Sequence, residues 1–199
     1  MILTVAPEGC APESGGHTFI AEIAVAARLS KAGPTATKRT PVTDTIERHP
    51  AVRYLDQISV GDAWRTGGRT ITESDLVTFG TWSGDMHPLH TDEEYARRTE
   101  FGGRIFQGPG ALAIAFGLEM SLGWKMGSAI AFLGIKEWNL LGPVRIGDTL
   151  SVREEVVEVR PSSSKPDRGI VTTKVQVVNQ NGVVCQEGLW VVLLSRSPE

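Results

Sequence analysis

Two imidazoles and a carboxylate occur within six residues near the middle of the chain. Asp85 is followed by His87 and His90, and Pro88 stands between the two histidines. Carboxylates and imidazoles are the side chains that most often take and return protons in general acid–base catalysis. Their spacing is not a recognised metal-ligand pattern, so we expect no metal here. The segment indicates a site for proton transfer.

The residues on either side predict how this segment is held. Thr72 and Asp75 form a capping-box pattern that starts a helix carrying Leu76, Val77 and Phe79 and ending at Gly84. A second capping box, residues 91–94, opens another short helix. Pro88 donates no backbone hydrogen bond and disfavours helix at the residue before it. We therefore expect residues 85–90 to be an irregular connection in which side chains converge.

A third helix is predicted after Gly108. Gly108 would be its N-cap, Pro109 its first helical residue, and Gly123 would lie at its far end, which gives about four turns. Residues 111–122 are almost continuously apolar, interrupted by Glu119 and Ser121. A helix that is apolar on nearly every side is buried, so other elements must wrap around it.

The wrapping is predicted to be an antiparallel sheet. Apolar alternation and turn signals such as Asn181-Gly182 favour four long strands, and a further strand over 63–72 is interrupted by Gly67-Gly68. The long strands are expected at residues 128–140, 149–159, 169–178 and 183–194. The resulting fold class is α+β, with an antiparallel sheet curled around one central helix.

Composition narrows the function. The chain has 199 residues, a formal net charge of -3 and a pI near 5.9, which predicts no nucleic-acid or membrane partner. It has two distant cysteines and no apolar run long enough to span a bilayer, so we expect a soluble, cytoplasmic protein. Residues 1–50 are rich in Gly, Pro, Ser and Thr and are expected to be a disordered tail or to follow a misplaced start, whereas 51–199 form one domain.

The central segment also resembles a known family. The motifs Ser83-Gly84-Asp85, Pro88-Leu89-His90-Thr91-Asp92, Phe101-Gly102-Gly103 and Gln107-Gly108, followed by the apolar helix, look like those of MaoC-like acyl dehydratases. These are the (R)-specific enoyl-CoA hydratases of the hot-dog fold. The resemblance extends over about residues 54–194 and implies reversible addition of water to a trans-2-enoyl thioester.

The resemblance assigns roles to particular residues. Asp85 and His90 match the catalytic pair that holds the attacking water, and the Gly108 amide matches the oxyanion-hole donor. The start of a helix suits that role, because it offers unpaired N–H groups and a positive dipole end. Gly110 is expected to make room for the thioester. Which of Asp85 and His90 is the base and which the acid stays open.

Two positions depart from the family pattern. Asn is common where this chain has His87, and His-Gly-Met is common where it has Gln107-Gly108-Pro109. We expect His87 and Gln107 to line the substrate site as polar contacts; Gln107 keeps hydrogen-bonding capacity but does not titrate.

The sequence leaves two alternative functions open. A hot-dog acyl-CoA thioesterase would need an acidic residue on or near the central helix, where Glu119 is the candidate. A non-catalytic acyl-CoA-binding hot-dog protein would also fit the departures at 87 and 107. In each case the expected ligand is an acyl-CoA thioester, with CoA part of the substrate and no separate cofactor. The resemblance implies a homodimer formed by edge-to-edge sheet pairing, which would also cover an open edge strand.

Overall fold

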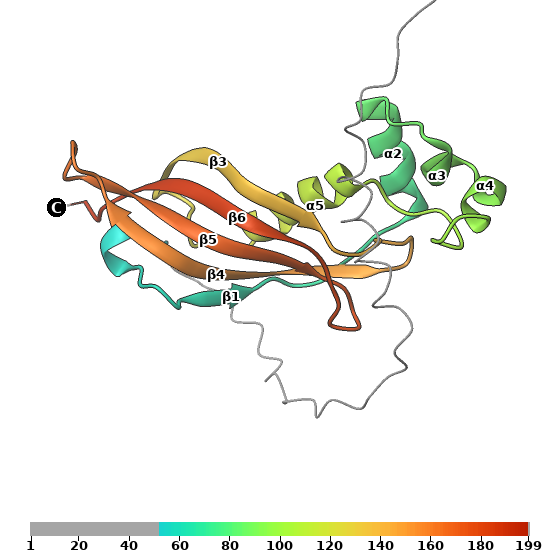
Figure 1. Cartoon of the computed structure of the whole chain (residues 1–199). Helices are drawn as coiled ribbons and strands as arrows, with labels where there is room; N and C mark the ends of the chain where they lie inside the picture. Colours follow the sequence, from blue (N-terminus) through green and yellow to red (C-terminus); the bar gives the residue numbers. More distant parts are fainter. Residues whose placement is uncertain (1–51, 199) are drawn as a thin grey trace, which may run out of the picture. The chain divides into compact units, whose positions relative to one another are not determined.

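The computed structural model describes residues 52–198, and the predicted tail over 1–50 lies outside this range. The described part is an antiparallel sheet with helices at one end and across one face (Figure 1). Its strands run in the order β1-β4-β5-β6-β3, and β2 pairs with β4. The bounds are β1 Ala63–Arg65, β2 Arg69–Thr70, β3 Ala129–Leu140, β4 Thr149–Pro161, β5 Arg168–Val178 and β6 Val184–Ser195.

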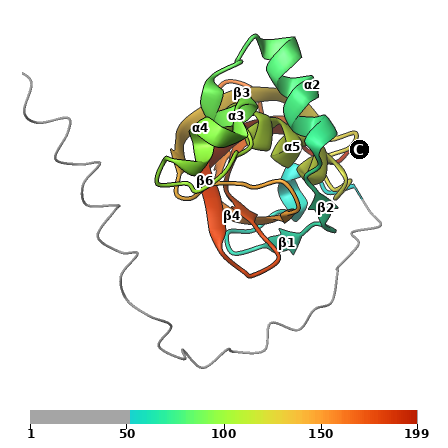
Figure 2. The same ribbon diagram turned by 90° about the vertical axis from the view of Figure 1, so that its right-hand side faces the viewer.

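The helices are η2 Leu55–Gln57, α2 Glu73–Ser83, α3 Pro88–Thr91, α4 Glu93–Arg97 and α5 Gly108–Met120. In Figure 2 the strands curl around α5, which confirms the predicted α+β arrangement. None of these helices is long and apolar enough to cross a membrane.

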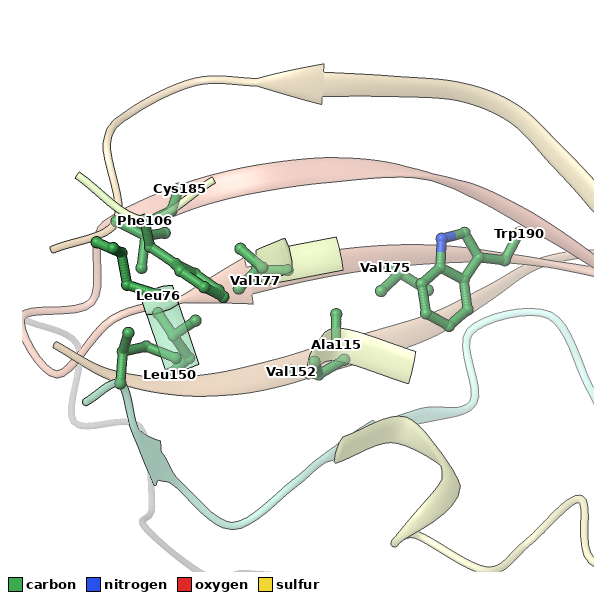
Figure 3. Close-up of a cluster of buried hydrophobic side chains, with 12 residues drawn as sticks. Leu76, Phe106, Ala115, Leu150, Val152, Val175, Val177, Cys185 and Trp190 are labelled. Atoms are coloured by element: carbon green, nitrogen blue, oxygen red, sulfur yellow. The ribbon is translucent and has the colours of Figure 1, made fainter. Parts of the chain in front are cut away.

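The main core lies between α5 and the sheet. Ala111 and Ala115 are fully buried there. Figure 3 shows Ala115 in one cluster with Val152, Val175 and Trp190. Alanine side chains are short, so the helix backbone can lie close to the strands. Leu76 of α2 and Phe106 join the same cluster, which fixes α2 against the start of α5.

The prediction that α5 is buried on nearly every side is wrong for this chain. Ala113 and Gly117 are exposed, and Met120 is 49% exposed. The sheet covers one side of the helix, and α2 covers only part of the other. The small residues on the uncovered side therefore remain at the surface.

The long strands were predicted to within two residues of their observed ends, because their apolar alternation is regular. The strand expected over 63–72 is broken at Gly67-Gly68 into β1 and β2, as the two glycines suggested. α2 also begins as predicted: the Asp75 N–H donates to Thr72 Oγ1, and the Thr72 N–H donates back to the Asp75 carboxylate.

The connection between α2 and α4 differs from expectation. Residues 88–91 form the one-turn helix α3, because proline has the right φ for a first helical position. α4 is capped by Asp92 and not by the predicted Thr91, whose hydroxyl instead donates to the Met86 and His87 carbonyls. The N-cap of α5 is Gln107, so Gly108 is already helical.

Candidate active site

Asp85 and His90 approach each other at the end of α2. The His90 Nε2 lies 3.6 Å from Asp85 Oδ2, with His90 buried and Asp85 half-buried. The His90 Nδ1 lies 2.8 Å from the Ile105 carbonyl oxygen. A carbonyl can only accept, so Nδ1 carries a proton and donates it. In the neutral form of this ring, the lone pair is then on Nε2 and faces Asp85.

Local hydrogen bonds hold Asp85 in place. Gly84 ends α2 in the left-handed conformation, with φ of 80°, which turns the chain sharply before Asp85. The Ser83 hydroxyl donates to the Phe79 carbonyl at 2.7 Å and accepts from the Asp85 N–H at 3.2 Å. The carboxylate thus extends from a backbone that is anchored to the last turn of α2.

His87 has a structural contact of its own. Its Nδ1 accepts a hydrogen bond from the Leu89 N–H at 3.1 Å and so caps α3, the helix that carries His90. Asparagine has a side-chain oxygen able to make the same cap. The His87 ring also makes edge contacts with His90 and Tyr95, with centroid distances of 6.2 and 6.1 Å. His87 is therefore next to the pair, with one ring nitrogen already used.

The first turn of α5 supplies a backbone donor, the Gly108 N–H. The N–H of Gly108 makes no hydrogen bond to any other described residue, and Pro109 has no N–H. A Cβ at position 108 would lie 2.8 Å from Leu140 Cδ1 of β3. A larger residue at position 108 would therefore have to displace the Leu140 side chain, and glycine lets the start of α5 lie close to β3.

Gly110 is required by a neighbouring side chain. A Cβ there would lie 2.6 Å from Cζ of Phe106. Gly110 also borders a cavity of about 330 Å³ between α2 and α5, together with Phe79, Trp82, Phe106 and Ile114. The expected role of making room for a thioester thus competes with a packing role that the structure shows directly.

Gln107 is completely buried and binds the protein itself. Its Nε2 donates to the carbonyls of Leu76 and Asp85, each at 3.4 Å, while its Oε1 has no hydrogen-bond partner among the described residues. Gly80 leaves room for this amide, since a Cβ there would lie 3.0 Å from Gln107 Nε2. Gln107 therefore links the Asp85 backbone to the start of α5.

A second titratable cluster lies at the far end of α5. Lys125 Nζ lies 2.6 Å from Glu119 Oε1 and 2.6 Å from Glu154 Oε1, and all three side chains are buried. Burial and the neighbouring Glu154 raise the pKa of Glu119 to about 7, against the attraction of Lys125. Trp124 Nε1 donates to Glu154 as well. Glu119 is thus engaged in an internal ion pair.

Sequence reasoning missed Gln186. This β6 residue is 2% exposed; its Nε2 donates to the Gly108 carbonyl at 3.0 Å, and its Oε1 accepts from Trp138 Nε1 at 3.1 Å. A signal was present: Gln186 shares the inward register of Trp190, Val192 and Leu194. A polar residue at an inward position needs a hydrogen-bond partner, and that partner is the first residue of α5.

No group of three or more His, Cys, Asp or Glu residues within 52–198 is arranged to hold a metal ion. The arginines near the pair are engaged with acids: Arg104 binds Glu73 and Glu93, and Arg97 binds Glu93 and Glu94. The titratable residues brought together near the start of α5 are therefore Asp85 and His90, with His87 beside them.

An antiparallel sheet wrapped around a central helix is the arrangement of the hot-dog fold. The fold is shared with a Mycobacterium tuberculosis protein described as a double hotdog fold, at a TM-score of 0.65 and 21% identity over 74% of this chain and 46% of that one. Residues 57–179 match the family described as MaoC like domain. The chain belongs to this family.

Named relatives extend the comparison. The chain is 36% identical over 110 residues to a 3-hydroxybutyryl-CoA dehydratase of Methylorubrum extorquens, covering 55% of this chain and 68% of that protein. It is 36% identical over 105 residues to protein MaoC of Klebsiella aerogenes, covering 53% of this chain but only 31% of that protein. The structure of a MaoC-like dehydratase from Rhodospirillum rubrum aligns with a TM-score of 0.67 and 32% identity, covering 74% of this chain and 99% of that one.

Proposed function

We propose that the protein is an enoyl-CoA hydratase that reversibly adds water to a trans-2-enoyl thioester, with Asp85 and His90 as the catalytic pair. The observation that carries the proposal is the 3.6 Å separation of His90 Nε2 and Asp85 Oδ2. This is too long for a good direct hydrogen bond but lets one water lie within hydrogen-bond distance of both atoms. Membership of the MaoC-like family and the relative named as a dehydratase support the same reaction.

The tautomer of His90 gives the water an orientation. Nε2 of neutral His90 and the Asp85 carboxylate are both acceptors, so the shared water donates its two hydrogens to them. Its oxygen lone pair then faces away from the pair, towards the β-carbon of the enoyl group. As the C–O bond forms, one proton of the water passes to the pair, and a proton from the pair is added to the α-carbon. The net reaction adds one water molecule across the double bond.

Charge that develops on the thioester oxygen needs a donor. The Gly108 N–H at the start of α5 has no hydrogen-bond partner within residues 52–198 and lies at the positive end of the helix dipole. We assign it this role, and we assign His87 to the wall of the site through its free ring nitrogen. Gln107 acts on Asp85 through the protein backbone, since its amide protons are directed at main-chain carbonyls.

A panel of substrates tests the proposed reaction and distinguishes three outcomes. The purified full-length protein is incubated with trans-2-enoyl-CoA thioesters of different chain length, and the products are weighed by mass spectrometry. Gain of one water is the expected result. Release of free CoA would indicate a thioesterase, against which the internal ion pair of Glu119 argues. Binding of acyl-CoA with no product would indicate a non-catalytic acyl-CoA protein.

We also infer that two copies associate through the β3 edge. β3 ends the strand order and has no second neighbour within residues 52–198. Apolar side chains on and just after it are exposed by between 44% and 61%: Ile130, Phe132, Leu133, Leu140 and Leu141. An open edge with this much apolar surface is stabilised by pairing with another chain.

A further inference from the structure

Gln186 connects the sheet to the first residue of α5. Its Nε2 donates to the Gly108 carbonyl at 3.0 Å, while its Oε1 accepts from Trp138 Nε1 at 3.1 Å. The orientation of the amide is unambiguous, because an indole N–H only donates and a carbonyl only accepts. Three elements, β3, β6 and α5, are thus joined by a chain of two hydrogen bonds.

Gly108 needs such a contact if its own N–H is to be fixed. Glycine has the widest backbone freedom of any residue, and the following peptide, to Pro109, has no N–H of its own to anchor it. Leu140 packs against the Cα of Gly108, and Gln186 binds its carbonyl. With Cα and the carbonyl held by these two contacts, rotation of the Gly108 backbone about φ and ψ is restricted, and so is the direction of its N–H.

We propose that Gln186, held by Trp138, is a positioning residue that aims the Gly108 amide at the thioester oxygen. This inference rests on the proposed hydratase function. A donor aimed at the place where charge develops acts more strongly on the transition state than on the bound substrate. Loss of Gln186 therefore lowers kcat and leaves KM for an enoyl-CoA nearly unchanged.

The variant Gln186→Met keeps the volume of the side chain and removes both hydrogen bonds. Gln176→Met is the matched control: Gln176 lies on the neighbouring strand β5, where its Nε2 donates to Glu187 at 2.8 Å, away from α5. With crotonyl-CoA as the probe, we expect kcat of Q186M to fall by about 10- to 100-fold, less than the loss of a whole oxyanion donor. We expect Q176M to stay within about twofold of the wild type.

An infrared measurement separates positioning from a merely structural role. In an Asp85→Asn background, which slows turnover, bound crotonyl-CoA labelled with ¹³C at the carbonyl reports the hydrogen bond to its oxygen by a lowered stretching frequency. We expect the lowering to be smaller in D85N/Q186M than in D85N, and unchanged in D85N/Q176M. If Q186M does not fold, Trp138→Phe provides the test, because it frees the Gln186 Oε1 and leaves an aromatic ring in the core. We then expect the carbonyl frequency to be lowered slightly less in D85N/W138F than in D85N.

The two proposals fail in different ways. If the wild-type protein hydrates none of the enoyl-CoA thioesters, the hydratase function fails and the role of Gln186 falls with it. If the wild type is active but Q186M matches Q176M in kcat and in carbonyl frequency, the role of Gln186 fails alone. A rise in KM at constant kcat would likewise overturn it, since that pattern belongs to ground-state binding.

Discussion

The imidazole of His90 is held between a backbone carbonyl on one side and the carboxylate of Asp85 on the other. Its Nδ1 is 2.8 Å from the Ile105 oxygen, and its Nε2 is 3.6 Å from Asp85 Oδ2. The first contact fixes the tautomer and the second leaves a place for water. Removal of either side chain should therefore stop proton transfer without disturbing the fold.

Asp85→Asn and His90→Gln are expected to lower kcat for enoyl-CoA hydration by at least about 10²–10⁴-fold. Thermal melts should remain near that of the wild type. Asp92→Asn is the control, because Asp92 caps α4 in the same segment and asparagine is an equally good cap. Near-normal turnover by D85N or H90Q would refute the catalytic assignment.

His87 should be replaceable by asparagine. His87→Asn keeps an acceptor for the Leu89 N–H, whereas His87→Ala removes the cap of α3 and should cost about 1 kcal/mol. Urea denaturation of both variants measures the difference. Equal stability of H87A and H87N would show that the ring nitrogen does not stabilise α3.

The Glu119 pair should make stability depend on pH. The pKa of Glu119 is raised from 4.5 to about 7 in the folded protein, so between these values the folded chain holds a proton that the unfolded chain releases. The contribution of Glu119 to stability is then greatest below about pH 4.5 and is lost as the pH rises through about 7, a difference of about 3 kcal/mol.

Glu119→Gln should remove this part of the pH dependence, as measured by urea denaturation at pH 5 and pH 8. Glu155→Gln changes an exposed acid next to Glu154 in sequence and serves as the control. A slope that is the same in E119Q and the wild type would mean that Glu119 is already ionised at the lower pH.

Two glycines of α5 should respond in opposite ways to alanine. Gly110→Ala would place Cβ 2.6 Å from Phe106 Cζ and should destabilise the protein by about 1–3 kcal/mol. At Gly117 nothing lies within 4 Å of the added Cβ, and alanine favours helix, so Gly117→Ala should be neutral or stabilising by up to about 1 kcal/mol. Free energies of unfolding from urea titrations test both.

The oligomeric state should depend on β3. Leu133→Lys places a charge on the exposed edge strand and should shift the protein from dimer to monomer in sedimentation velocity runs. Val60→Lys, at an apolar residue elsewhere that is at least as exposed as Leu133, should leave the dimer intact. A wild-type protein that sediments as a monomer at all concentrations would contradict the proposed association.

Local patterns in the sequence predicted local structure well. Thr72 and Asp75 form a four-residue capping motif that is enough to predict the start of α2. The alternation of apolar and polar residues in β5 and β6 can likewise be recognised without knowledge of a distant partner. Pro88 was ambiguous, because a proline that disfavours helix at the preceding residue also starts a helix well, and α3 was missed for that reason. The Glu119–Lys125–Glu154 cluster and the Gln186 contact join residues about 30 and 80 positions apart, which no short motif encodes.

The group that orients His90 belongs to the main chain. Every amino acid at position 105 carries the same carbonyl oxygen, so mutation of that side chain leaves the acceptor in place. In many hydrolases a polar side chain orients the histidine, whereas here the Ile105 carbonyl is the partner of His90 Nδ1. The imidazole is instead steered by the path of the backbone, and it can be misdirected only by changes that shift the loop itself.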